Sequence, residues 1–322
     1  MDIRANAGQL GMRTLQPVCK RCGQALSGTY ITALGATWHP EHFLCAGCKK
    51  PINTGGFVQH QGSPYHKECF GRGVAPHCAY CNKPLVGQYI VDHWGTQFCP
   101  EHQDQYPECR FCGRLVPPQQ QVISERNGNS ISIRCAACRA NAVESMNQAQ
   151  PLFMRLVQWV NGQGLLYNNL KLRIELCSAE KLGQNTRGGG GDTLGTTLFQ
   201  SYSLLGIMNL RTEVKAVGVL RGLPSALFQA VAVHELGHVW LGVHGVISLP
   251  DWGTEGFCEL LAYHLLTQKI GTAESHYYAA TIEQSTDIIY GDGFRRVRGL
   301  AKTIGFRRLL EGLLTSKQLP IE

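Results

Sequence analysis

The sequence predicts an α+β protein with a cysteine-rich amino-terminal half of short hairpins and a carboxyl-terminal half that combines strands with helices. Twelve of the fourteen cysteines in the 322 residues precede residue 140, and they occur in closely spaced pairs. Beyond them, residues 172–177 and 214–220 alternate or run apolar in the manner of β-strands. Apolar runs of helical length follow at 223–245 and 251–268. The abrupt change in cysteine density indicates more than one domain.

The cysteine pairs combine with nearby histidines into four complete sets of four zinc ligands. In each set a C-x-x-C pair forms a tight turn whose two sulfurs reach one ion, and 16 to 22 residues then return a second pair of ligands. Such closed sites leave no position for a substrate, so we expect them to stabilise modules that are too short for a sufficient core. The repeat between residues 22–31 and 81–90 supports a tandem arrangement. The sets are Cys19, Cys22, His39 and His42; Cys45, Cys48, His66 and Cys69; Cys78, Cys81, Cys99 and His102; and Cys109, Cys112, Cys135 and Cys138.

The spacing of these sets, and of the strands and helices after them, predicts three domains behind a short tail. Pro151 is expected to begin an amphipathic helix that continues to Trp159, which places the start of the last domain near residue 150. The expected ranges are 1–18 for the tail, 19–72 and 76–140 for two zinc-binding domains, and 150–322 for the domain of strands and helices.

The segment HELGH at 234–238 gives the carboxyl-terminal domain a candidate catalytic zinc site. On an α-helix, His234 and His238 are one turn apart and present two imidazole nitrogens to the same ion. Glu255, 17 residues farther on in a second helix, supplies a third ligand and leaves the fourth tetrahedral position to water. Glu235 then acts as the base that takes a proton from this water during attack on a carbonyl. The same pentapeptide occurs by chance in ordinary helices, but the helix-start and helix-stop residues around it favour the metal site.

Three further residues near this site have roles that the sequence leaves open. Glu259 lies one turn beyond Glu255 and is either a hydrogen-bond partner of a zinc-bound histidine or a solvated surface residue. The helix turns Cys258 away from Glu255, so we expect a buried thiol rather than a ligand. Tyr290 is a candidate for stabilising the oxyanion, although packing beneath the site is the favoured interpretation.

Two other segments complete the carboxyl-terminal half. The strand at 214–220 precedes the motif helix and is expected to offer an open edge to the backbone of a substrate. The glycine-rich stretch 187–192 lacks the Lys-Ser/Thr of a phosphate-binding loop, so we expect a surface loop there.

Composition argues against nucleic-acid and membrane partners. The formal net charge is +7, but deprotonated zinc-bound thiolates offset much of the positive charge of the amino-terminal half, and no basic stripe with interleaved aromatic residues occurs. No apolar stretch has the length of a signal peptide in residues 1–18 or of a membrane span farther along. Because zinc-bound thiols suit a reducing compartment, we expect a cytoplasmic location.

A family resemblance extends over about residues 19–320. Residues 19–69 resemble a LIM domain, including the run WHPEHF at 38–43, in which His42 stands where that family usually has cysteine. Residues 78–138 resemble the degenerate second LIM domain of the DA-one family, the ubiquitin-activated LIM peptidases that limit organ growth in plants. The runs AVGVLRGLP at 216–224, EGFC at 255–258 and YGDGFR at 290–295 are similar to signatures of that family.

The resemblance implies tandem LIM-type zinc-ribbon hairpins followed by a zincin-like, gluzincin-type metallopeptidase domain. It makes His234, His238 and Glu255 the ligands of one catalytic zinc ion and Glu235 the base, beside four structural zinc ions. Plant members carry ubiquitin-interacting helices before the LIM region, whereas Met1 to Val18 precede Cys19 here, so ubiquitin is retained as a less favoured partner. Gly237 replaces a bulkier residue of the motif, at a cost of about 1 kcal/mol in helix propensity.

Two functions fit these observations. The first is a zinc endopeptidase that cleaves protein substrates, with LIM modules that recruit protein partners or restrain the active site. The second is a LIM-domain adaptor whose peptidase fold binds zinc but no longer cleaves. The presence of Glu235 favours the peptidase, because an adaptor does not need a base beside the metal.

Overall fold

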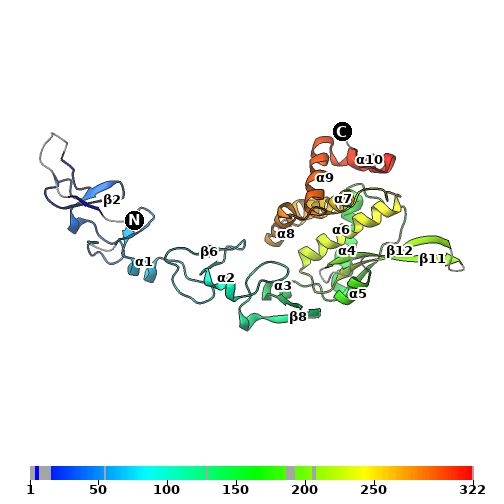
Figure 1. Cartoon of the computed structure of the whole chain (residues 1–322), viewed down its shortest axis with the longest axis horizontal. Coiled ribbons are helices and arrows are strands. Elements are labelled where there is room, and N and C mark those ends of the chain that lie inside the picture. Colours follow the sequence, from blue (N-terminus) through cyan, green and yellow to red (C-terminus); the bar gives the residue numbers. More distant parts are fainter. Residues whose placement is uncertain are drawn as a thin grey trace. The chain divides into compact units, whose positions relative to one another are not determined.

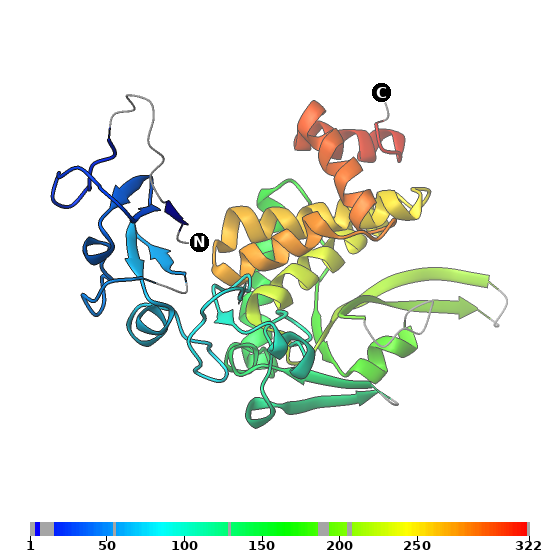
Figure 2. The same cartoon turned by 60° about the vertical axis from the view of Figure 1, so that its left-hand side comes forward.

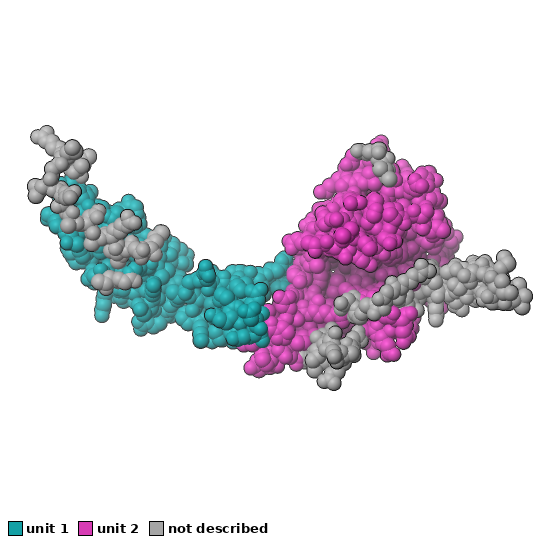
Figure 3. Space-filling model, viewed as in Figure 1, with its two compact units in different colours: residues 1–105 teal, residues 106–322 magenta. Residues whose placement is uncertain are grey.

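The computed structural model describes residues 4–6, 16–53, 56–127, 130–185, 193–204 and 208–320 of the chain. The chain divides into two compact units, residues 1–105 and 106–322 (Figure 3). This division falls inside the expected domain at 76–140, so the ligand set at 78–102 belongs to the first unit and the set at 109–138 to the second. Strands and helices occur together, which confirms the α+β class. The glycine-rich stretch 187–192 lies outside the described residues.

The first unit consists of short antiparallel hairpins and single helical turns. Strands β1, β2 and β3 form a three-stranded sheet, while β4 pairs with β5 and β6 pairs with β7. These elements are β1 (Arg4–Asn6), β2 (Tyr30–Ala33), β3 (Ala36–Trp38), η1 (Pro40–His42), β4 (Val58–His60), β5 (Ser63–Tyr65), α1 (Lys67–Gly73), β6 (Ile90–Val91), β7 (Gln97–Phe98) and α2 (Glu101–Gln105).

The same tight turn follows the first C-x-x-C pair of each of the four ligand sets. The residue after the second cysteine has a positive φ of 58° to 72° and donates its backbone N–H to the carbonyl of the first cysteine at 2.7 to 3.0 Å. Glycine adopts this left-handed backbone without steric cost, and asparagine does so more easily than other residues. The four residues are Gly23, Lys49, Asn82 and Gly113. Local sequence therefore positions both sulfurs of each pair.

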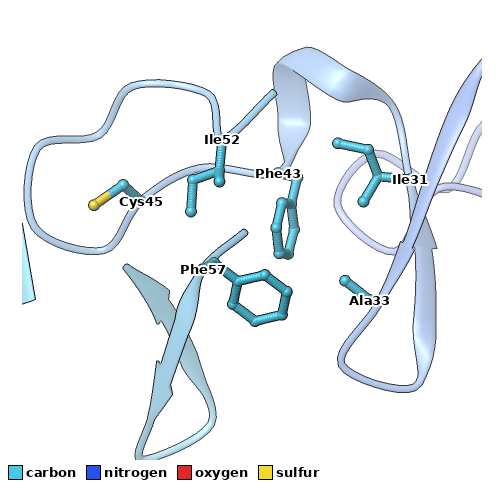
Figure 4. Close-up of a cluster of buried hydrophobic side chains, with 6 residues drawn as sticks. All are labelled: Ile31, Ala33, Phe43, Cys45, Ile52 and Phe57. Carbon is cyan, nitrogen blue, oxygen red and sulfur yellow. The ribbon is translucent and has the colours of Figure 1, made fainter. Parts of the chain in front are cut away.

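A small apolar core joins the two hairpins of the first zinc-binding domain (Figure 4). Phe43 and Phe57 meet edge to face with their ring centroids 5.1 Å apart, and Ile52 is fully buried beside them. Ile31 and Ala33 approach this core from strand β2. Few apolar residues are available to such a short domain, so metal binding must supply much of its folding free energy.

The second unit begins with a zinc-binding hairpin and then forms a sheet and a group of helices. The hairpin elements are η2 (Pro118–Gln120), β8 (Val122–Asn127), β9 (Ser130–Arg134) and α3 (Ala136–Ala140). The remaining elements are α4 (Met146–Gly162), β10 (Ile174–Cys177), α5 (Ala179–Asn185), β11 (Gly195–Leu204), β12 (Met208–Leu220), α6 (Ser225–Val243), α7 (Asp251–His264), the π-helical turn η3 (Leu265–Ile270), α8 (Ala273–Gln284), α9 (Gly291–Ile304) and α10 (Phe306–Ser316).

Helix α4 begins earlier than the sequence suggests. Ser145 caps it through a capping box with Gln148, so the helix starts at Met146 rather than at Pro151. Pro151 lies near the amino-terminal end, where one missing hydrogen bond is tolerated more easily than in a helix centre. Residue 150, the expected start of the last domain, consequently lies inside a continuous helix.

The sheet of the second unit has the strand order β10-β12-β11. Strand β10 is parallel to β12, and β11 is antiparallel to it. Strand β12 is thus the central strand, and the expectation that residues 214–220 form an open edge is wrong. Strand β12 forms hydrogen bonds with β11 on one side and with β10 on the other, so β11 lies at an edge of the sheet (Figure 1).

Helix α6 occupies the centre of the second unit. It contacts β11 and β12 on one side and α4 and α7 on others, and α9 in turn packs against α7 (Figures 1 and 2). Its side chains are buried around most of its circumference, including Phe228, Leu236 and Trp240. No helix in the described part of the chain is long and apolar enough to cross a membrane.

The fourth zinc-binding hairpin packs directly onto the segment that leads into α6. Residue Ala142 forms an antiparallel bridge with Pro224. Beside it, the Val143 N–H donates to the Leu223 carbonyl and the Gly222 N–H donates to the Val143 carbonyl, both at 2.9 Å. The Arg134 guanidinium donates to the Gly222 carbonyl at 2.7 Å and to Glu144 at 3.0 Å. This hairpin is therefore built into the unit that carries the HELGH segment.

Candidate active site

Helix α6 brings His234 and His238 to one face as the spacing predicts. Pro224 occupies its N-cap position, and the chain leaves the helix at Gly245 with a φ of 66°. The two rings lie with their centroids 5.0 Å apart, and their Nε2 atoms are separated by 3.2 Å. Both imidazoles therefore direct the same nitrogen to one point.

Helix α7 brings Glu255 to that point. Its Oε2 atom lies 3.1 Å from Nε2 of His234 and 3.3 Å from Nε2 of His238. These three ligand atoms form a nearly equilateral triangle. Tetrahedral zinc with ligands at about 2.0 to 2.1 Å requires ligand atoms about 3.3 Å apart, so the triangle fits three corners of a zinc site. The fourth corner faces the cleft that these residues line.

Cys258 also lies close to the two histidines. Its Sγ is within 4.8 Å of their nearest nitrogens, and the side chain is fully buried. Oxygen and nitrogen ligands of one tetrahedral zinc ion are about 3.3 Å apart, which the distances of 3.1 and 3.3 Å from Oε2 of Glu255 to the two histidines match. Burial raises the pKa of Cys258 well above its ordinary value, which keeps it a neutral thiol.

Glycines allow the helices around the ligands to approach closely. A Cβ on Gly237 would lie 2.8 Å from Sγ of Cys258, and a Cβ on Gly256 would lie 2.4 Å from the backbone of Gly293. Gly237 thus gives α6 and α7 the contact that aligns their ligands, and Gly256 does the same between α7 and α9. The presence of Gly237 inside the HELGH segment therefore has a packing reason beyond helix propensity.

Glu235 is held beside the ligands by strand β11. Its side chain is 6% exposed, and its Oε2 accepts a hydrogen bond from the Thr197 hydroxyl at 3.0 Å. Burial raises the pKa of Glu235, while His234, His238 and Thr197 lower it, and the net direction is upward. A raised pKa makes the carboxylate a stronger proton acceptor near neutral pH.

Gly195 is the second contact between β11 and this carboxylate. A Cβ there would lie 2.5 Å from Cγ1 of Val231 and 2.9 Å from Oε1 of Glu235. Only glycine leaves room for the strand so close to α6. Neither Gly195 nor Thr197 stands out in the sequence, because both are distant from the motif along the chain and belong to no ligand pattern.

Glu259 contacts the other ring nitrogen of His234. Oε1 of Glu259 lies 3.3 Å from Nδ1 of His234, while Nε2 of the same ring is one corner of the ligand triangle. Burial lowers the pKa of His234, but Glu255 and Glu259 raise it by more, and the net direction is upward. A carboxylate in this position fixes ring orientation and increases the basicity of a metal-bound imidazole.

Tyr290 lies at the mouth of the cleft rather than beneath the site. Its ring stacks on His234 with a centroid distance of 6.3 Å and an interplanar angle of 28°, and the residue is 44% exposed. Burial, followed by the charges of Glu255 and Glu259, raises the pKa of Tyr290 to about 12. Its hydroxyl therefore keeps its proton at neutral pH and is able to donate a hydrogen bond. Packing beneath the site, the interpretation favoured from sequence, does not match this exposure.

The four cysteine-rich ligand sets assemble as the sequence predicts, and the ligand atoms within each set lie within 4.8 Å of one another. Zinc with sulfur ligands at about 2.3 Å requires sulfurs about 3.8 Å apart. The observed separations are 3.7 Å for Cys109 and Cys138, and 3.8 Å for Cys81 and Cys99. The sulfur of Cys48 lies 3.3 Å from Nδ1 of His66. These sets fit zinc.

The surroundings of the first cysteine in each set lower its pKa and favour the thiolate. The N–H of His66 donates to Sγ of Cys45 at 3.4 Å. Burial raises the pKa of Cys45, but backbone N–H groups, among them those of Cys48 and His66, outweigh burial and lower it to about 6. In the third set, Nδ1 of His102 lies 3.3 Å from the Gln105 side-chain oxygen, which leaves Nε2 as the ligand atom.

Comparisons with known proteins agree with this organisation. The family model of the LIM domain matches residues 19–74, and the model described as Protein DA1 matches residues 184–278, which contain the HELGH segment. Protein DA1 of Arabidopsis thaliana is 23% identical, over 94% of this chain and 68% of its own length. The LIM domain-containing protein HDR3 of Oryza sativa subsp. japonica is 25% identical, over 94% and 74%. Protein DA1-related 1 of Arabidopsis thaliana is 24% identical, over 94% and 66%.

The two matching models cover the LIM ligands and the α6–α7 region separately, in the order that the sequence predicts. The relatives match nearly the whole chain and carry the names of one family. The resemblance inferred from the motifs is thereby confirmed. The chain belongs to the DA1 family, the DA-one family of the sequence analysis, with an amino-terminal LIM domain and a carboxyl-terminal DA1-like domain.

Proposed function

We propose that the protein is a zinc-dependent endopeptidase of the gluzincin type, with a zincin-like catalytic domain in its second unit. The observation that carries this proposal is the triangle of His234, His238 and Glu255, whose ligand atoms are 3.1 to 3.3 Å apart and face a cleft that also contains Glu235. Three ligands with an open fourth position are typical of a catalytic rather than a structural zinc site.

Zinc bound to this triangle would polarise a substrate carbonyl and acidify water in the fourth position. Glu235 accepts the proton of the attacking water and delivers it to the leaving amine, a role for which its raised pKa is suited. Thr197 keeps the Glu235 carboxylate oriented toward the cleft. Tyr290, protonated at neutral pH, donates a hydrogen bond to the oxygen of the tetrahedral intermediate.

Strand β11 offers the edge along which a peptide substrate binds. The Leu220 N–H donates to the Leu194 carbonyl at 2.8 Å, and hydrogen-bonded pairs alternate along an antiparallel ladder. The backbone groups of Gly195 and Thr197 consequently point away from β12, toward the side on which no described strand pairs. An extended substrate adds to this side as an extra strand.

The cysteine-rich modules have a separate role in this proposal. Four structural zinc ions, beside the catalytic one, stabilise the hairpins at 19–72 and 76–140, and the exposed hairpin surfaces recruit protein substrates or partners. Ubiquitin remains a candidate partner, because the resemblance implies activation by it. The thiol-rich ligand sets suit the cytoplasm.

The decisive experiment compares the wild-type protein with Glu235→Gln. Glutamine keeps the size of the side chain and leaves all three ligands in place, so zinc content should stay unchanged while peptide cleavage falls by about 10² to 10⁴-fold. Cleavage of denatured proteins would be followed by mass spectrometry, with and without a ubiquitylating system.

The alternative function is an adaptor whose second unit binds zinc without catalysis. Wild-type and Glu235→Gln proteins that are equally inactive under every condition, with the same zinc content, would support the adaptor and reject the peptidase.

A further inference from the structure

The turn between α8 and α9, residues 285–290, brings Tyr290 to the metal ligands. It is a short connection that ends where α9 begins at Gly291. The ring of Tyr290 stacks on His234 and forms part of the wall of the cleft. A hydroxyl that donates to a tetrahedral intermediate has to lie close to its working position, because a misplacement of about 1 Å costs on the order of 100-fold in rate. The groups that hold this turn therefore bear on the reaction as well as on the fold.

Burial of apolar side chains contributes little to holding the turn. The side chains of Ile288 and Ile289, which precede Tyr290, are 75% and 39% exposed. Tyr290 itself is 44% exposed. The free energy gained by burial grows with the apolar area removed from water, and these three residues leave much of that area exposed. The shape of the turn must come mainly from polar contacts.

Asp287 makes two of these polar contacts with one carboxylate oxygen. Its Oδ1 accepts the backbone N–H of Ile289 and that of Tyr290, both at 2.8 Å. The backbone carbonyl of Asp287 also accepts the N–H of Asp292, in the first turn of α9, at 2.9 Å. Hydrogen bonds to an ionised carboxylate are stronger than those between neutral groups. Asp287 thus fixes the backbone from which the Tyr290 side chain extends.

Arg295 ties the same turn to the end of α8. Its guanidinium donates to the carbonyl of Ser285 at 2.7 Å and to that of Glu283 at 3.2 Å, and it also pairs with Asp292. Gly291 completes the closure, because a Cβ there would collide with the Ser285 carbonyl. The first glycine, the aspartate and the arginine of the run YGDGFR therefore close the turn, and the tyrosine of this run is the residue that the turn presents to the cleft.

We propose that Asp287 is a positioning residue, which holds the backbone of Tyr290 so that its hydroxyl is in place for the tetrahedral intermediate before the substrate binds. Asp287 is not among the described residues that line the cleft, so it acts through Tyr290. A donor that is fixed in advance stabilises developing charge without reorganisation at the moment of reaction. This inference rests on the proposed peptidase function and adds the residue that orients its oxyanion donor.

The first test compares Asp287→Ala with Asp287→Asn in zinc-loaded protein, on a peptide whose cleavage disappears with Glu235→Gln. Alanine removes the acceptor of both N–H groups, so kcat should fall by about 10 to 100-fold while KM changes little, since the affected contact is made in the transition state. Asparagine removes the charge but retains a side-chain oxygen, so kcat should stay close to that of the wild type. Equal losses in the two variants would assign the effect to charge and overturn the proposal.

The second test is a double-mutant cycle with Tyr290→Phe. Removal of the hydroxyl should lower kcat by about 10² to 10³-fold, as loss of one oxyanion donor does. In that background Asp287→Ala should cause no further loss, because the group that Asp287 positions is already absent. If Asp287 only stabilises the fold, Asp287→Ala lowers kcat by the same factor in both backgrounds, and that result would overturn the proposal.

A third readout does not depend on turnover. 3-Fluorotyrosine is incorporated at position 290, and its ¹⁹F signal is recorded in zinc-loaded protein and in urea-unfolded protein. Because the ring stacks on His234, the two signals should differ. Asp287→Ala should move the signal of the folded protein toward the unfolded value, whereas Asp287→Asn should leave it in place. An unchanged signal in Asp287→Ala would show that the ring is held without this carboxylate.

The outcomes separate the positioning role from the peptidase function. Absence of any Glu235-dependent cleavage rejects the peptidase and, with it, the catalytic purpose of the turn, whatever the ¹⁹F signal shows. Cleavage that depends on Glu235 but is not reduced by Tyr290→Phe rejects the positioning role alone.

Discussion

The closed cysteine-rich sites and the open His-His-Glu site are built in opposite ways. In each closed site, one local turn sets the first C-x-x-C pair, and a short hairpin returns the other two ligands. In the open site, two ligands share helix α6, but the third arrives on α7, which packs closely because Gly237 of α6 leaves room for Cys258 of α7. A closed site therefore depends on local chain geometry, whereas the open site depends on how the helices pack.

A second contrast lies among the closed sites themselves. The first three ligand sets belong to a unit that has its own small core around Phe43. The hairpin of the fourth set, in contrast, is hydrogen-bonded to the segment before α6. Loss of zinc should therefore have local consequences in the first case and affect helix α6 in the second.

The largest effect should come from removing a ligand of the fourth set. Cys135→Ser should destabilise the second unit by several kcal/mol, because structural zinc sites contribute on the order of 10 kcal/mol and the hairpin supports Gly222 and Leu223. Thermal unfolding of the full chain would measure the change. Cys48→Ser is the control, and its effect should be confined to the LIM transition. Equal effects of both variants on the transition of the second unit would remove the contrast.

Truncation sharpens the same comparison. A chain that starts at residue 106 should fold and bind two zinc ions, whereas one that starts at residue 151 loses the bridge at Ala142 and the first turns of α4. The backbone hydrogen bonds of Val143 alone are worth about 1 kcal/mol each, so the shorter chain should be at least about 2 kcal/mol less stable. Denaturant unfolding would test this. A shorter chain of equal stability would show that the hairpin is dispensable.

The open site should lose its metal before the closed ones. Glu255→Gln replaces a charged ligand and should weaken zinc binding at this site by at least about 100-fold, while Glu259→Gln, which changes only the partner of His234, should weaken it by roughly 10-fold. Zinc content after dialysis against graded chelator would give both values. The 322-residue chain should keep four ions when Glu255 is replaced and five when it is intact. Equal affinities for the two variants would place Glu259 among the ligands.

The smallest effect should follow from Thr197→Val, which removes the hydrogen bond to Glu235 but retains the shape of the side chain. That bond favours the charged carboxylate, so its loss should raise the pKa of Glu235 further. Because the base must be deprotonated to act, the acidic limb of the pH profile of kcat/KM should move to higher pH, with activity lost below it. Thr197→Ser retains the hydroxyl and should leave the limb in place. A shift in both variants would point to packing rather than to the hydrogen bond.

The sequence by itself determined the features that depend on near neighbours along the chain. The C-x-x-C turns, the helical spacing of His234 and His238, and the start of α6 after Pro224 all follow from local backbone geometry and appear in the structure where they were expected. Glu255 was expected near the two histidines because its helix follows the first after a short connection, and the structure brings the three side chains together. The side chains that meet at each candidate site could therefore be named without coordinates.

Tertiary structure decided what depends on residues that are distant in the chain. Strand order made β11 rather than residues 214–220 the edge beside the cleft, and only packing revealed that Gly195 and Thr197 hold Glu235. Packing likewise joined the fourth zinc-binding hairpin to the start of helix α6. Periodicity reports which face of an element is apolar, but pairing partners and close approaches depend on the complementarity of surfaces that the chain brings together only when it folds.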